Sequence, residues 1–65
     1  MTKKKVYEYR TTLHELYQEI DGQRRSDNSM ETNISINELL LAVGKAIYCC
    51  DETLEAMKND PLYID

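Results

Sequence analysis

The chain has 65 residues, a formal net charge of −4, two cysteines, and neither tryptophan nor phenylalanine. This length allows one small domain over residues 1–65 and argues against an enzyme, because most enzymes need a larger frame to build a walled pocket. A chain of this size buries only about 60% of the surface that it exposes when unfolded. Its own core is therefore marginal, and we expect a second copy to complete it.

The apolar residues of the first third recur at helical spacing. They step by three and four along Val6, Tyr9, Leu13, Leu16 and Ile20. Gly22 follows as a natural helix stop. We predict a helix over about residues 4–21, with these five residues facing a core or a dimer interface.

A second interpretation of the N-terminus stays open from the sequence alone. Residues 6–11 have the composition of a strand, because Val, Tyr and Thr favour extended backbone. Thr12 and Glu15 have the spacing of a capping box, which would begin a shorter helix at Leu13. The alternative fold is thus a short N-terminal strand followed by two helices.

Residues 22–33 contain one apolar residue, Met30, and predict a mobile loop. A helix start follows at Ser35, which has the spacing of a capping box with Glu38. Asp60-Pro61 marks the end, because proline disfavours helical dihedrals in the residue before it. We predict a helix over about residues 36–58 and a tail over 59–65.

The predicted second helix has its own apolar seam with a heptad repeat. Its members are Ile36, Leu40, Val43, Ile47, Cys50, Leu54 and Met57. In the middle of this helix the apolar stripe widens almost all round, so one short chain cannot cover it. We predict an all-α, antiparallel two-helix hairpin that dimerises into a four-helix bundle, with Gly44 serving close helix approach.

Motifs for chemistry are incomplete, so we expect no catalytic residue, no metal and no cofactor. His14-Glu15 begins like a zinc-protease helix, but Gln18 stands where the second histidine is needed. Cys50 lies on the seam as a small core residue, and the acidic residues after it disfavour a thiolate. The two thiols suit a reducing cytoplasm, and the longest apolar run is too short to span a bilayer.

Charge is divided unevenly between the two parts of the chain. Residues 1–25 carry a net charge of +2 and residues 26–65 a net charge of −6. The basic residues that would contact nucleic acid are Lys3, Lys4, Lys5, Arg10, Arg24 and Arg25. The isoelectric point near 4.8 disfavours that role, because nucleic-acid-binding domains usually lie above about 9.

The sequence predicts a small regulatory or adaptor protein that acts by protein–protein binding, of the kind found as accessory proteins in phages and plasmids. A nucleic-acid-binding regulator is the alternative. The predicted partner-binding residues are acidic and tyrosine side chains outside the seams: Tyr17, Asp51, Glu52, Glu55 and Tyr63. We expect a homodimer with a further protein partner and no membrane association.

Overall fold

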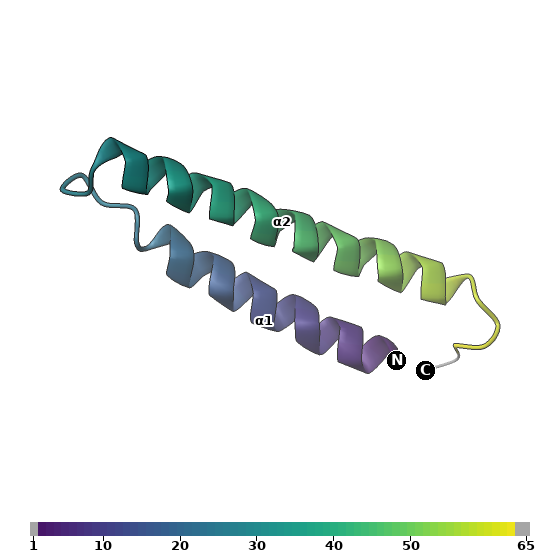
Figure 1. Ribbon diagram of the computed structural model, residues 1–65. Coiled ribbons are helices and arrows are strands. Elements are labelled where there is room, and N and C mark those ends of the chain that lie inside the picture. The colour runs from purple at the N-terminus through teal and green to yellow at the C-terminus, as the bar shows by residue number, and fades with distance from the viewer. Residues whose placement is uncertain (1, 64–65) are drawn as a thin grey trace.

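The computed structural model describes residues 2–63, which form two antiparallel helices joined by a short loop (Figure 1). Helix α1 spans Lys3–Asp21 and helix α2 spans Met30–Lys58. The start of α1 lies beside the end of α2, and the loop closes the opposite end of the hairpin. The predicted all-α hairpin is confirmed. The alternative with an N-terminal strand is wrong, since residues 6–11 lie within α1.

Helix α1 begins one residue before the predicted start. The Thr2 side chain accepts a hydrogen bond from the Lys5 backbone N–H at 3.2 Å, which satisfies one of the free donors of the first turn. The helix ends at Gly22, as predicted, although Gly22 has right-handed dihedrals (φ −66°) and no left-handed cap forms. Thr12 lies inside α1, so the capping box predicted from Thr12 and Glu15 does not begin a helix.

Helix α2 begins at Met30, earlier than the predicted start near residue 36. The Ser29 hydroxyl accepts from the Thr32 backbone N–H at 3.1 Å and is the observed N-cap. Ser35, the predicted cap, lies in the second turn of α2. The predicted loop over 22–33 is therefore too long, and the observed loop covers residues 22–29.

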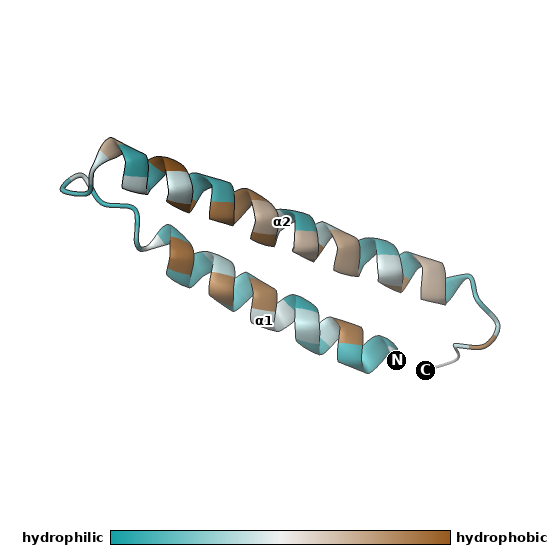
Figure 2. Cartoon of the chain, in the orientation of Figure 1, coloured by the Kyte–Doolittle hydropathy of each residue, from teal (hydrophilic) through white to brown (hydrophobic). Residues whose placement is uncertain are grey.

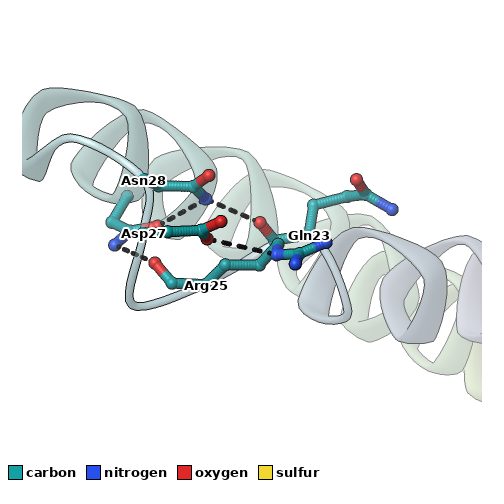
Figure 3. A network of polar contacts seen from close by, with 5 residues as sticks. Gln23, Arg25, Asp27 and Asn28 are labelled. Carbon is teal, nitrogen blue, oxygen red and sulfur yellow. Dashed lines mark hydrogen bonds and ion pairs between the residues drawn. The ribbon is translucent and has the colours of Figure 1, made fainter.

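Hydrogen bonds tie the loop to the first turn of α2 (Figure 3). The Asn28 amide donates to the Gln23 carbonyl at 2.8 Å and to the Asn33 side chain at 3.0 Å. Asn33 in turn donates to the Arg25 carbonyl at 3.0 Å. Because Asn33 must sit on the first turn of a helix to make both contacts, this network explains why α2 starts early.

The core is a thin seam between the helices. The fully buried side chains are Val6 from α1 and Leu40, Val43 and Met57 from α2. All four belong to the predicted seams, and hydrophobic segments recur along both helices in Figure 2. The molecule measures 51 × 14 × 12 Å and has a radius of gyration of 15.4 Å, against about 11 Å for a compact chain of this length. This rod shape leaves much apolar surface uncovered.

Candidate protein-binding surfaces

The hairpin exposes more surface than a folded monomer of its mass. Its accessible area is 5175 Å², whereas a compact protein of 7.6 kDa exposes about 4,300 Å². The exposed large hydrophobic side chains are Tyr7, Tyr9, Leu16, Tyr17, Met30, Ile34, Leu39, Leu41, Tyr48 and Leu62. Seven of them lie on α1 or α2 outside the predicted seams, so packing of α1 on α2 leaves apolar side chains exposed.

One side of the interhelical boundary is bridged by polar contacts, and we call it the polar side. Arg10 Nε lies 2.6 Å from Asp51 Oδ1. This ion pair links α1 and α2 in the half of the hairpin that is away from the loop. Near the loop, Arg24 donates to the Asn37 side chain at 3.0 Å. Exposed ion pairs contribute only about 0–1 kcal/mol, but these two contacts cover this side of the seam.

Tyr17 covers Gly44 between those two contacts. A β-carbon on Gly44 would lie 3.8 Å from Tyr17 Cε2, which is ordinary van der Waals contact. An alanine therefore fits at this position. Packing of α1 on α2 therefore does not depend on a glycine at residue 44, and the role of Gly44 in close approach of a further helix stays a prediction.

The opposite side of the boundary is an open groove of about 490 Å³, and we call it the apolar groove. Its lining comes from both helices: Val6, Tyr9, Leu13, Ala46, Cys49, Cys50 and Thr53. None of these side chains is charged, and the Thr53 hydroxyl already donates to the Cys49 carbonyl at 2.8 Å. The groove therefore offers mainly apolar contact, with the Tyr9 hydroxyl and the two cysteine thiols as its remaining polar groups.

Two exposed leucines extend the apolar groove along the hairpin. Leu16 follows Tyr9 by seven residues and is 40% exposed, and Leu39 precedes Ala46 by seven residues and is 50% exposed. A spacing of seven residues is two helical turns, so each leucine lies on the same face as its partner. Ala42, also exposed, lies between Leu39 and Ala46 on this face.

A second apolar surface runs along the outer edge of α2. Ile34, Leu41 and Tyr48 are each seven residues apart and are 50%, 74% and 62% exposed. We call this line of three side chains the outer row. Helical spacing continues it into Glu52 and Glu55, which are exposed at the end of α2.

The outer row was missed at the sequence level. Its signal is present as the steps of seven from Ile34 to Leu41 to Tyr48. The wide apolar stripe in the middle of the helix hid these steps, because several heptad lines overlap there. The position of α1 decides which line is buried: α1 covers the line through Leu40 and leaves the line through Leu41 exposed.

The predicted partner-binding residues do not gather at one place. Tyr17 lies over Gly44, seven residues or about 10 Å along α2 from Asp51. Asp51 is paired with Arg10, whereas Tyr63 is half-buried beyond the turn at Asp60. The last two residues of the predicted tail, 64–65, lie outside the described residues. Of the predicted set, Tyr17 lies beside Leu41, and Glu52 and Glu55 lie at the other end of the same row beyond Tyr48.

Five of the six basic residues proposed for nucleic-acid contact form two separate groups, and Arg10 lies on α1 between them. Lys3–Lys5 lie in the first turn of α1, and Arg24–Arg25 follow its end, with a helix of about 28 Å between them. Four of the six are paired with carboxylates. These pairs are Lys5–Glu8 at 3.3 Å, Arg10–Asp51 at 2.6 Å, Arg24–Asp21, and Arg25–Asp27 at 3.2 Å. The fold thus places no continuous basic surface along the hairpin between these groups.

Within residues 2–63, no group of three or more His, Cys, Asp or Glu side chains has a geometry suited to a metal ion. Both cysteines are free thiols, Cys49 exposed and Cys50 half-buried. Over the same residues, neither helix is long and apolar enough to span a bilayer.

No family model, no curated protein and no solved structure matches the chain.

Proposed function

We propose that this chain is a small, non-enzymatic regulatory or adaptor protein that binds another protein through the outer row of α2. The observation that supports this best is the exposure of Ile34, Leu41 and Tyr48 at regular heptad spacing. Isolated exposed hydrophobic residues are ordinary on protein surfaces, but apolar residues aligned at a spacing of seven along one helix are typical of a face that packs against another helix.

The spacing of the outer row indicates the shape of the partner. Apolar side chains that repeat every seven residues along a helix pack against a second helix with a similar stripe. The row spans 15 residues from Ile34 to Tyr48, or about 21 Å along the axis, which matches four turns of a partner helix. We therefore expect an amphipathic helix rather than an extended peptide.

The acidic end of α2 sets the direction of that helix. Glu52 and Glu55 adjoin the outer row beyond Tyr48, and both are exposed. Complementary charges at the rim of an interface raise the rate of association and fix the register. The partner helix should therefore carry lysine or arginine at the end that meets these two carboxylates.

The proposal includes a homodimer and a cytoplasmic location, as expected from the sequence. The cytoplasmic location rests on the two free thiols, which persist in a reducing compartment. The homodimer rests on the surplus of exposed surface in the 5175 Å² hairpin.

A lysate pull-down with matched variants tests the proposal. Leu41→Glu places a charge in the middle of the outer row at a side chain that is 74% exposed. Thr11→Glu makes the same charge change on the exposed surface of α1, away from both apolar surfaces. Mass spectrometry should find a protein that the wild type and Thr11→Glu retain at physiological salt and that Leu41→Glu loses.

The captured protein is then purified and titrated against the three forms of the chain. We expect Leu41→Glu to weaken its affinity by tenfold or more, on the order of 1.4 kcal/mol, while Thr11→Glu stays within about twofold of the wild type. Equal affinity for the wild type and Leu41→Glu would show that the outer row is not the binding site. A wild type that retains no protein contradicts the adaptor role itself.

A further inference from the structure

The apolar groove has no role in the proposed adaptor site, because it lies on another side of the hairpin. We propose that a second copy of this chain fills it, so that two hairpins pack groove to groove as an antiparallel four-helix bundle. This assignment rests on the homodimer of the proposed function and says which face it uses; it is independent of the protein partner of the outer row, so groove pairing and partner binding can fail separately.

The amount of surplus surface matches what a dimer needs. The hairpin exposes about 900 Å² more than a compact monomer of 7.6 kDa. A stable protein–protein interface of standard size buries about 800 Å² on each partner. One copy of the chain docked along one face of the rod would therefore remove the surplus, and no larger partner is required.

The distribution of polar contacts selects the face. On the polar side, Arg10 and Asp51 already satisfy each other across the seam, and Arg24 contacts Asn37. A second copy docked there would have to desolvate these groups, which costs free energy unless new partners replace the lost water. In the apolar groove, docking desolvates no charged lining residue.

The shape of the groove face suits contact with its own copy. Its α2 side carries the small side chains Ala42, Ala46 and Cys49 beyond the larger Leu39, whereas Tyr9 and Leu16 are exposed on its α1 side. An interface between identical copies related by a two-fold axis pairs each patch with its symmetry mate. The large α1 side chains of one copy can then fill the space above the small α2 side chains of the other.

Charges along the edges of the groove face favour the antiparallel arrangement. Helical spacing places Lys5, which also pairs with Glu8 of its own helix, on the α1 edge near the open end of the hairpin, and Glu19 and Glu38 on the edges near the loop. An antiparallel two-fold brings the lysine of each copy toward the two carboxylates of the other. A parallel arrangement would place like charges together, which is unfavourable.

The first experiment measures the mass of the chain in solution with charge variants on two faces. At about 100 µM the wild type should have twice the mass of the 7.6 kDa chain. Cys49→Glu, at an exposed position in the groove, should halve this mass, and Leu41→Glu on the outer row should leave it unchanged. A monomeric wild type, or a Cys49→Glu variant that stays dimeric, would overturn the assignment, as would dissociation by Leu41→Glu alone.

Cysteine labelling provides a second measurement that does not require a charge variant to fold. Cys50→Ala leaves Cys49 as the reporter thiol of the groove. The matched control carries Tyr48→Cys together with Cys49→Ser and Cys50→Ala, so its reporter lies on the outer row one residue away. Both forms are labelled with N-ethylmaleimide at about 1 µM and about 100 µM protein.

We expect labelling of Cys49 to slow by tenfold or more at the higher concentration, because the second copy covers it, while the control thiol keeps its rate. Equal rates for Cys49 at both concentrations, in a chain that has the monomer mass at the lower one and twice that mass at the higher one, would show that the dimer uses another face. Slowing of the control alone would assign self-association to the outer row and refute the proposal.

Discussion

Alanine substitutions at two adjacent leucines compare the contribution of the core to stability with that of the surface. Leu40 is 5% exposed between the helices, and Leu41, its neighbour, is 74% exposed on the outer row. Both lie in the interior of α2, so Leu→Ala changes helix propensity equally at the two positions. Any difference between Leu40→Ala and Leu41→Ala therefore reports burial alone.

The cost of Leu40→Ala follows from the burial of its side chain. Truncation of a buried leucine costs about 2–5 kcal/mol, and the cost is lower where neighbouring side chains can relax into the space. The core here is one thin seam beside an open groove, so we expect about 2–3 kcal/mol. A domain of 65 residues has a total stability of roughly 3–10 kcal/mol, and the variant thus loses a large share of it. Leu41→Ala should cost within about 0.5 kcal/mol.

Urea unfolding followed by circular dichroism measures both variants against the wild type at one fixed protein concentration, because a dimer gains stability with concentration. For a slope of about 1 kcal/mol per molar urea, Leu40→Ala should lower the midpoint by about 2–3 M with the slope unchanged. A loss below about 1 kcal/mol, or an equal loss for Leu41→Ala, would refute the packing of α1 on α2 described above.

Three further predictions concern helix ends, the glycine in α2 and the ion pair. Ser29→Ala should destabilise the chain by about 1 kcal/mol in urea unfolding through loss of the N-cap, whereas Ser35→Ala should be near neutral. A larger loss for Ser35→Ala than for Ser29→Ala would indicate that α2 begins near residue 36. Gly44→Ala should raise stability by up to about 1 kcal/mol, since its β-carbon meets only ordinary contact, and a lower midpoint would mean that another copy or partner packs on Gly44. A double-mutant cycle on Arg10 and Asp51 should give a coupling of about 0.2–1 kcal/mol that weakens with salt, and a coupling insensitive to salt would contradict the exposure of the pair.

The fold was predictable because the two seams repeat without interruption. Val6, Leu40, Val43 and Met57, which lie on the predicted lines, are the residues that the structure buries. Proline at residue 61 and glycine at residue 22 also mark helix ends that the structure confirms within a residue or two. These signals are local, since each depends on residues within two turns of one another.

The start of α2 was not predictable from such local signals, because the chain offers two serines with capping potential. Ser35 has the better sequence signature, with Glu38 three residues later, yet Ser29 is the cap. The choice depends on Asn33, whose side chain joins the first turn of α2 to the loop carbonyl of Arg25 and to Asn28. A contact of this kind exists only once the hairpin has closed, so no periodicity in the sequence reports it.

The division of the exposed apolar surface into two sites depends on the placement of α1. In the sequence, the line through Leu40 stands out as the seam, but the roles of the neighbouring lines through Leu41 and Ala42 are not distinguished, because neighbouring lines on one helix differ only by rotation. Helix α1 covers the first line, and its Arg10 and Tyr17 lie on the side toward Leu41. That asymmetry leaves an apolar groove on the side of Ala42 and an isolated row at Leu41. The apolar groove, which no polar contact spans, suits a second copy of the chain. The narrow outer row, with acidic residues at its end, suits a transient protein partner.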